Sequence, residues 1–361
     1  MKLAIAHDTL TEYGGAERVL QSLLRLYPDA HVFTAYCDYA FIRRMFPSLT
    51  PDRLHVSAIQ RLKLSRWGYL LQFLAPAFWK AFNFENYDIV ISSSSFFLSN
   101  TIRVVKPIHI QYILGPPKNI FGLSPKVPTQ KYLPYENFLA REYKLALNSG
   151  AYVVTDSKHM QQMLRQMFDV VSHVIYPPVI IPKKPVPHRG GSYYLTVSRL
   201  DDTKEIETVI HACSDLGVPL KVVGVGSDSQ YVHYLCSLAG PTVDFLGFLD
   251  DTKIRRLYKN TIAFLFSPRA EDFGIAAVEA MAHGVPFIAY YGGGAKETVI
   301  EGITGTFFYE YTPESLKKVI RKFNPDKYDY SLLYGESLKF SEARFYREIS
   351  RLVESFFICP S

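Results

Sequence analysis

Residues 267–307 read SPRAEDFGIAAVEAMAHGVPFIAYYGGGAKETVIEGITGTF. The apolar run 263–266 before them has the character of a buried strand, and Pro268 ends it. From Ile275 to Met281, apolar residues recur at helical spacing, and a glycine-rich loop follows. The stretch therefore predicts a strand, a turn and a helix, which together form the repeating unit of a parallel α/β sheet.

The turn before this predicted helix has the features of a ligand site. A helix amino terminus presents unpaired N–H groups and a partial positive charge, which favour an anion. Glu271 and Glu279 flank the same turn, and carboxylates accept hydrogen bonds from hydroxyl groups. The combination favours a ligand with both phosphate and sugar hydroxyls, such as a nucleotide sugar. The alternative is one carboxylate near a helix cap and one on a solvated helix face.

Length and composition indicate an ordinary globular protein. The 361 residues correspond to two domains at roughly 150 residues each. No apolar run has the ~18 to 20 residues that a membrane span needs, and His7 and Asp8 interrupt the apolar start too early for a signal peptide. We therefore expect a cytoplasmic protein. Its four cysteines are scattered without metal-ligand spacing, so neither zinc nor disulfides are predicted.

Strand and helix patterns alternate in both halves of the chain. The expected strands are 3–6, 31–36, 88–93, 109–114, 152–155, 173–176, 193–197, 220–225, 243–246, 263–266 and 286–290. The expected helices between them are 16–27, 39–46, 130–148, 157–168, 204–216, 231–239 and 251–260. A proline-rich run from Pro177 to Pro187 resembles a linker.

This alternation predicts an α/β fold with two doubly wound, Rossmann-like domains, whose parallel sheets face a central cleft. The expected domains are 1–180 on the acceptor side and 181–340 on the donor side. A terminal helix within 341–361 is expected to pack back on the first domain. Ligands of such folds bind at the carboxyl ends of the strands.

Two cations lie near one predicted strand end. Arg199 follows the strand 193–197, and Lys204 lies five residues further on. Both can reach a diphosphate, Arg199 with its planar fork and Lys204 as a point charge. The alternative is a pair of surface cations next to acidic neighbours.

The first half offers weaker candidates. Asp8 ends the first predicted strand and either accepts a hydrogen bond from an acceptor hydroxyl or caps a loop. His109 begins a later strand, where a structural role is favoured. The loop before Gly15 lets the backbone approach a ligand but lacks the GxGxxG pattern, so a nicotinamide cofactor has little support.

The segment 53–84 contains no acidic residue, and its cations are interleaved with aromatic and aliphatic side chains. Either it contacts an anionic membrane surface or a lipid-linked substrate, or it forms two core helices with basic outer faces. No nucleic-acid-binding motif accompanies it. The residues concerned are Arg53, Arg61, Lys63, Arg66, Trp67, Tyr69, Leu70, Leu71, Phe73, Leu74, Phe78, Trp79 and Lys80.

Four motifs resemble the GT4 family of retaining glycosyltransferases, which have the GT-B fold. EDFGIAAVE at 271–279 is similar to the family's E-x7-E motif, and AMAHGVP at 280–286 is similar to its usual continuation. SRLDDTKEIETVI at 198–210 resembles the segment that binds the donor diphosphate. GGAERVL at 14–20 and VIYPPV at 174–179 match as well.

The resemblance implies a role for each matched residue. Arg199 and Lys204 would hold the diphosphate, Glu271 would accept from the sugar hydroxyls, and Glu279 would bind the ribose. Donor contacts are also implied for Gly15, for the backbone of Phe273, Gly274 and Ile275, and for Val278 lining the nucleotide pocket. The resemblance further implies retention at the anomeric carbon without a protein nucleophile, and neither a metal nor another cofactor.

One family feature is missing. Related enzymes often have Tyr-x-His-x-Pro in the first domain, whereas this chain has Leu114 at the histidine position after Tyr112. His109 does not take over that place in the pattern. Lys118 keeps a positive charge where the family tends to have arginine, so we assign it, with Asp8 and His109, to the acceptor side.

The resemblance predicts a hexosyltransferase of polysaccharide biosynthesis. It would move a hexose from UDP-glucose or a related UDP-hexose, with GDP-mannose less favoured, to a growing glycan that is either free or polyprenyl-linked. The protein would then work in the cytoplasm or at the inner face of the membrane. The alternatives are a nucleotide-sugar hydrolase or epimerase, and an inactive glycan-binding or scaffold protein on the same fold.

Overall fold

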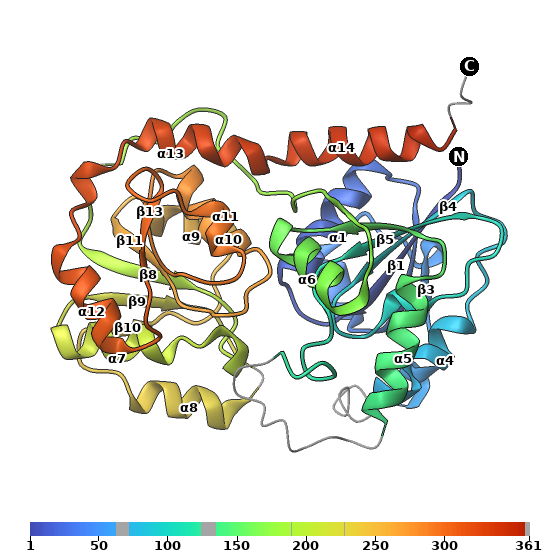
Figure 1. Ribbon diagram of the computed structural model, residues 1–361, viewed down its shortest axis with the longest axis horizontal. Helices are drawn as coiled ribbons and strands as arrows, with labels where there is room; N and C mark the ends of the chain where they lie inside the picture. Colours follow the sequence, from blue (N-terminus) through green and yellow to red (C-terminus); the bar gives the residue numbers. More distant parts are fainter. Residues whose placement is uncertain (63–71, 124–134, 189, 227, 358–361) are drawn as a thin grey trace. The chain divides into compact units, whose positions relative to one another are not determined.

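The computed structural model describes residues 1–62, 72–123, 135–188, 190–226 and 228–357 (Figure 1). It divides the chain into two compact units. Unit 1 comprises Met1–Pro178 with Phe345–Ser361, and unit 2 comprises Val179–Arg344. The terminal helix, α14 (Glu342–Ser355), therefore contributes all but its first residues to unit 1.

Unit 1 contains a parallel sheet with the strand order β3-β2-β1-β4-β5-β6-β7. Its strands are β1 (Leu3–Leu10), β2 (His31–Cys37), β3 (Leu54–Val56), β4 (Ile89–Ser94), β5 (Ile108–Ile113), β6 (Tyr152–Thr155) and β7 (His173–Val174). The order reverses direction between β1 and β4, so the loops after these two strands diverge. That point is where doubly wound sheets leave room for ligands.

Helices cover both faces of this sheet (Figure 1). They are α1 (Gly15–Leu26), α2 (Tyr39–Met45), α4 (Ala75–Lys80), α5 (Glu136–Leu147), α6 (Lys158–Phe168) and α14. Successive residues of β1 point to opposite faces, so Ile5 joins one core cluster and Ala6 the other. Phe345 and Ile349 of α14 join the cluster of Ile5. Their four-residue spacing aligns them on one side of the helix.

Unit 2 contains a second parallel sheet, with the order β10-β9-β8-β11-β12-β13. Its strands are β8 (Tyr193–Val197), β9 (Leu220–Val223), β10 (Val243–Phe245), β11 (Thr261–Phe266), β12 (Phe287–Tyr290) and β13 (Gly305–Phe308). Its helices are α7 (Glu207–Leu216), α8 (Ser229–Ser237), α9 (Asp251–Tyr258), α10 (Ile275–Ala282), α11 (Ala295–Thr298), α12 (Pro313–Lys322) and α13 (Tyr330–Ser337). Here the order reverses between β8 and β11. The predicted α/β class with two parallel, doubly wound sheets is confirmed.

The start of α7 differs from the prediction. The expected helix begins at Lys204, whereas α7 begins at Glu207 and Lys204 ends a short 3-10 turn, Asp202–Lys204. Glu205 interrupts the helix because its backbone is left-handed, with φ 49°. Lys204 is therefore held in a turn rather than on a helix.

The described part of the segment 53–84 is partly buried. Trp79 of α4 is fully buried and donates from Nε1 to the carbonyl oxygen of Phe97 at 2.7 Å. Lys80 forms an ion pair with Glu142, but about half of its side chain is exposed, and Phe73 is exposed as well. Both alternatives for the segment, membrane contact and core helices with basic outer faces, therefore stay predictions. Residues 63–71, with Arg66, Trp67 and Tyr69, lie outside the described residues.

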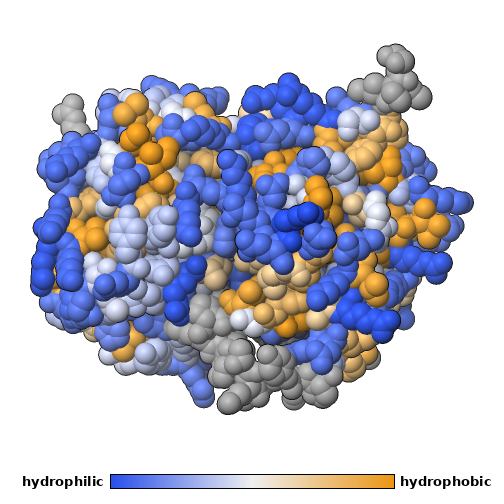
Figure 2. Space-filling model, in the orientation of Figure 1, coloured by the Kyte–Doolittle hydropathy of each residue, from blue (hydrophilic) through white to orange (hydrophobic). Residues whose placement is uncertain are grey.

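The surface of the protein is mixed in polarity. Figure 2 shows hydrophobic residues in separate patches among polar ones on the face in view. Within the described ranges, no helix combines the length and the apolar character needed to cross a bilayer.

Candidate active site

Two predicted site residues that lie far apart in sequence, Lys204 and Glu271, are in direct contact. Nζ of Lys204 lies 2.7 Å from Oε2 of Glu271, and each side chain is only about a fifth exposed, at 18% and 19%. Lys204 comes after β8 and Glu271 after β11, and these two strands pair directly. The contact therefore lies at the carboxyl ends of the strands where the sheet order reverses.

The ion pair leaves bonding capacity on both groups. An ammonium group has three donors, and a carboxylate has about four lone-pair sites. Lys204 can therefore bind Glu271 and a phosphate oxygen together, while Glu271 accepts from the ammonium and from a hydroxyl. The ammonium also offsets the repulsion between the carboxylate and a bound anion.

Arg199 lies in the same loop but is paired with a different residue, Asp201. Its Nε is 3.4 Å from Oδ2 of Asp201, and nearly half of its side chain is exposed. The structure thus brings Lys204 and Glu271 together and leaves Arg199 at the surface beside Asp201. A long exposed side chain can still turn towards a ligand.

The helix that follows Glu271 begins with a glycine that no other residue replaces easily. Gly274 is the N-cap of α10 with φ 92°, in the left-handed region, and a Cβ there would lie 2.6 Å from Cζ of Phe266. The N–H groups of Gly274 and Ile275 lie at the start of α10, where a helix has no internal acceptors for them. Phe273 contributes only backbone, because its ring is buried against Phe340 at 5.2 Å between centroids.

Two further predicted residues lie within α10. Glu279 is nearly buried, and its carbonyl oxygen lies 2.7 Å from Nδ1 of His283. Val278 is fully buried, at 0% exposure. The prediction that Val278 lines the nucleotide pocket stays a prediction.

A glycine-rich loop packs directly against Glu271. The N–H of Gly294 donates to the carbonyl oxygen of Glu271 at 2.8 Å. Gly293 has φ 53°, and a Cβ there would come within 2.4 Å of the same oxygen. The loop after β12 therefore fixes the backbone of Glu271 by close approach.

The structure adds two charged residues that the motifs do not indicate. Glu205 is completely buried, and its Oε1 lies 2.7 Å from Nη2 and 2.9 Å from Nε of Arg269. In the sequence, Glu205 is simply one of several acidic neighbours of Lys204. The only sequence signal is position, since Glu205 follows Lys204 and Arg269 precedes Glu271 by two residues.

In unit 1, Asp8 binds the backbone of the loop after β4. Its Oδ2 accepts from the N–H groups of Ser95, Phe96 and Phe97 at 2.6 to 2.8 Å, and its Oδ1 accepts from the N–H of Ser99 at 2.9 Å. Asp8 is 5% exposed. Of the two roles left open by the sequence, the structure favours loop capping, and the loop it caps follows a neighbouring strand.

Gly15 is the first residue of α1 and is exposed. The loop before it is held by Glu17, whose Oε2 accepts from the N–H of Gly14 at 2.8 Å. The other oxygen of Glu17 lies 3.4 Å from Nε2 of the buried His7. This arrangement keeps the start of α1 open at the carboxyl end of β1.

His109 lies near the amino-terminal end of β5, an interior strand of the unit 1 sheet. It is the second residue of β5, and its Nε2 lies 2.9 Å from Oγ of the buried Ser92. His109 thus lies near the amino end of β5, whereas Asp8 lies in the carboxyl-terminal half of β1 and Lys118 follows the carboxyl end of β5. The assignment of His109 to the acceptor side stays a prediction. Burial lowers the pKa of His109 to about 3, so its imidazole is neutral at physiological pH.

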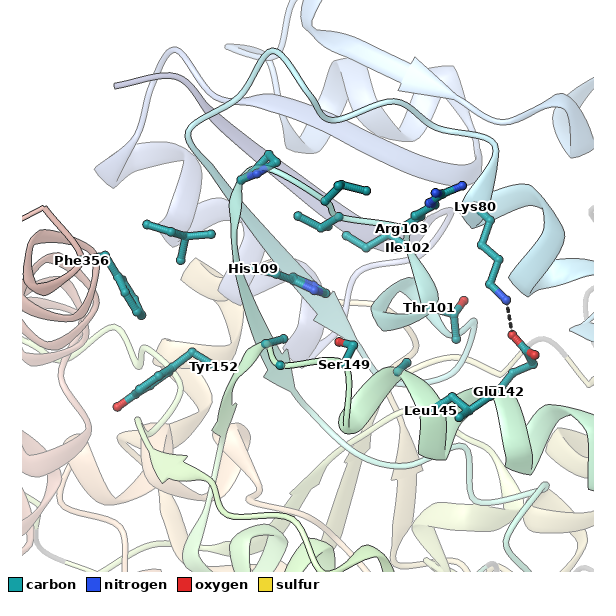
Figure 3. Close-up of a pocket in the computed structure, with 17 residues that line it drawn as sticks. Lys80, Thr101, Ile102, Arg103, His109, Glu142, Leu145, Ser149, Tyr152 and Phe356 are labelled. Carbon is teal, nitrogen blue, oxygen red and sulfur yellow. Dashed lines mark hydrogen bonds and ion pairs between the residues drawn. The ribbon is translucent and has the colours of Figure 1, made fainter.

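His109 lines a pocket of about 650 Å³ (Figure 3). The other walls come from the loop 101–108, from the end of α5 and from Phe356 of the terminal segment, and the Lys80–Glu142 ion pair lies at one side. This pocket contains none of the motif residues. We place the active site in unit 2 because ligands of doubly wound sheets bind at the carboxyl ends of the strands.

Leu114, at the position of the missing histidine, packs against the core of unit 1. Lys118 lies in the loop after β5 and is partly exposed. No group of three or more potential metal ligands among His, Cys, Asp and Glu is present in the described part of the chain.

The two doubly wound parallel sheets correspond to the GT-B fold. Anabaena HepE, solved with UDP and glucose, superposes with a TM-score of 0.73 at 20% identity, covering 98% of this chain and all of that one. Sucrose-phosphate synthase from Thermosynechococcus elongatus superposes with a TM-score of 0.72 at 17% identity, covering 99% of each chain. At these identities the likeness establishes the fold.

A family model matches the sequence of unit 2. Residues 180–333 match the model of the family described as glycosyl transferases group 1. The matched part of the chain carries Lys204, Glu205, Arg269, Glu271 and Glu279.

Curated relatives match over limited lengths. An uncharacterized glycosyltransferase of Methanocaldococcus jannaschii is 33% identical over 128 residues, which are 34% of this chain and 33% of that protein. Glycogen synthase of Thermus thermophilus is 34% identical over 164 residues, which are 43% of this chain and 37% of the synthase. The chain thus spans about a third of the length of these two relatives.

Proposed function

We propose that the protein is a glycosyltransferase that moves a hexose from a nucleotide sugar to a glycan acceptor, with retention at the anomeric carbon. The observation that carries the proposal is the Lys204–Glu271 ion pair at the switch point of unit 2. The relatives named as glycosyltransferase and glycogen synthase support transfer of a sugar. The complexes of HepE with UDP and with UDP-glucose support a UDP-hexose donor over GDP-mannose.

In this proposal each site residue has a stated task. Lys204, with Arg199 turning inwards, binds the diphosphate and stabilises the negative charge that develops as it leaves. The amino terminus of α10 adds N–H donors to the same anion. Glu271 accepts hydrogen bonds from the hexose and Glu279 from the ribose. These groups hold the donor so that only the anomeric bond faces the acceptor.

Retention follows if the acceptor attacks from the face that the diphosphate leaves. The diphosphate oxygen then takes the acceptor proton, and the new glycosidic bond forms as the old one breaks. Lys204 neutralises the leaving group and keeps its charge throughout. The reaction therefore needs no nucleophile from the protein and no cofactor besides the donor.

The acceptor is proposed only by class, as a growing glycan. Its binding residues are assigned to unit 1, which contains the acceptor-side candidates Asp8, His109 and Lys118. Membrane contact through the segment 53–84, and with it a lipid-linked acceptor, stays a prediction.

The test follows nucleoside diphosphate release from UDP-glucose and from GDP-mannose, with and without glycan oligosaccharides. The proposal predicts release that depends on an oligosaccharide, together with a product whose new linkage keeps the donor's anomeric configuration by NMR. Equally fast release without any oligosaccharide would identify a hydrolase instead. An inverted linkage would contradict the proposed mechanism.

A further inference from the structure

The residue next to Lys204 has an unusual backbone. Glu205 has φ 49° and ψ 39°, the left-handed conformation that glycine adopts without steric cost. It is nevertheless a glutamate, and its side chain is completely buried. Strain of this kind persists where the surrounding structure over-determines it, often beside a functional site. The side chain of Glu205 must therefore supply something that glycine would not.

The side chain binds Arg269 through several hydrogen bonds. Oε1 accepts from Nε at 2.9 Å and contacts Nη2 at 2.7 Å, while Oε2 accepts from the backbone N–H of Arg269 at 2.9 Å. The guanidinium carbon lies 4.4 Å from the ring centroid of Tyr311. Both the side chain and the main chain of Arg269 are thus fixed by one buried carboxylate.

The backbone of Glu205 is fixed as well. Its carbonyl oxygen accepts from Oγ of Ser267 at 3.0 Å and from the hydroxyl of Tyr311 at 2.8 Å. Ser267 and Arg269 belong to the segment after β11 that leads to Glu271. Every one of these bonds therefore joins the turn of Lys204 to the segment of Glu271 or to the ring packed on Arg269.

We infer that Glu205 and Arg269 are positioning residues that hold Lys204 and Glu271 at bonding distance before the donor binds. The inference rests on the proposed function of those two residues. Breaking the buried pair removes the side-chain bonds that join the turn of Lys204 to the segment of Glu271, so both are less constrained, although Ser267 still donates to the carbonyl oxygen of Glu205. A donor would then have to order both loops on binding, and its affinity would fall.

The first test compares UDP-glucose affinity by calorimetry in the full chain and in Glu205→Gln, which keeps the size and removes the charge. We expect about tenfold weaker binding, within the 10- to 100-fold range seen when groups that orient a ligand-binding residue are removed. Arg269→Lys, at a side chain that is 37% exposed, should give a similar loss, because lysine lacks the fork. Asp215→Asn is the matched control, since it breaks an ion pair with Lys317 at the far end of α7.

A double-mutant cycle separates positioning from general destabilisation. If Glu205 acts through the Lys204–Glu271 pair, Glu205→Gln should weaken binding less than about twofold further once Glu271→Gln is present. Losses that multiply would overturn the inference, as would unchanged affinity in both Glu205→Gln and Arg269→Lys.

A crystal structure of ligand-free Arg269→Lys provides a reading that does not depend on the donor. The inference predicts that the distance between Nζ of Lys204 and the Glu271 carboxylate exceeds 4 Å, the limit for a salt bridge, or that the two side chains adopt more than one arrangement. A retained 2.7 Å contact would overturn it. Failure of the unchanged protein to bind any nucleotide sugar would remove the proposed function, while this distance would still decide whether the two residues position the pair.

Discussion

The ammonium of Lys204 and the carboxylate of Glu271 lie 2.7 Å apart although 67 positions separate them in the chain. Parallel strands make this contact, because β8 and β11 pair and end at the same edge of the sheet. The pair combines a cation for a diphosphate with an acceptor for a hydroxyl. Those are the two needs of a nucleotide-sugar donor.

The two carboxylates of the site should differ in what they recognise. Glu271→Gln should weaken UDP-glucose binding roughly tenfold and UDP binding much less, because its partner hydroxyls are on the hexose. Glu279→Gln should weaken both ligands by a similar factor, because both contain the ribose. Calorimetric titrations of the two variants measure this contrast, and identical patterns in them would contradict the assignment of sugar and ribose.

Asp8 should matter for stability rather than for the acceptor. Asp8→Asn keeps the size of the side chain but replaces one carboxylate oxygen with an amide NH2 group. This group cannot accept from the backbone N–H groups that donate to Asp8 in the native protein. The free energy of unfolding should therefore fall by about 2 to 3 kcal/mol. Urea unfolding gives the loss, and donor affinity should stay within about twofold. A variant of normal stability that has lost only acceptor-dependent turnover would restore the acceptor role.

His109 should make unit 1 less stable in acid. Burial lowers its folded-state pKa to about 3, whereas an unfolded histidine has a pKa of about 6.5. The unfolded state thus binds more protons between these values, so this contribution to stability is complete above about pH 6.5 and is lost as the pH falls towards 3. Between pH 7.5 and pH 5, the unfolding free energy should fall by roughly 1 to 2 kcal/mol more than in His109→Gln.

That variant keeps a partner for Ser92 and removes the titrating ring, so it isolates His109 from the other buried histidines. Equal pH dependence of the two proteins in urea unfolding would show that the ring is protonated in the folded state as readily as in the unfolded one.

Activity should not depend on a divalent cation. The proposed diphosphate site uses Lys204, Arg199 and the start of α10 for charge compensation, and each is part of the chain. Turnover of UDP-glucose in excess EDTA should therefore stay within about twofold of the value in magnesium. A tenfold loss that magnesium restores would assign part of the charge compensation to a metal.

Much of the fold follows from local sequence. The alternation of apolar strands with amphipathic helices predicts both sheets, and the stretch 271–286 identifies the site end of unit 2. The contact between Lys204 and Glu271 is not itself predicted, but the sequence does indicate that each residue follows a strand, at whose carboxyl end ligands of such sheets bind. Here the sequence signal is strong because the site is built from successive strand-to-helix turns.

Other features depend on tertiary contacts that no local pattern encodes. The left-handed backbone of Glu205 and its pairing with Arg269 join positions 64 residues apart, and glutamate is a poor predictor of such a turn. The partners of Asp8 lie 87 to 91 residues away. Val278 matches its motif, but its complete burial also depends on packing around α10 that the motif does not encode.

The central claim is that the turn of Lys204 and the segment of Glu271 form a nucleotide-sugar site. The most direct measurement is calorimetric titration of the full chain and of Lys204→Ala with UDP-glucose and GDP-mannose, with Lys317→Ala as the control. We predict saturable binding of UDP-glucose that Lys204→Ala weakens about 10- to 100-fold, as expected for a lost charge-assisted hydrogen bond, and that Lys317→Ala leaves intact. Binding of neither nucleotide sugar, or equal affinity in Lys204→Ala and the unchanged protein, would contradict the claim.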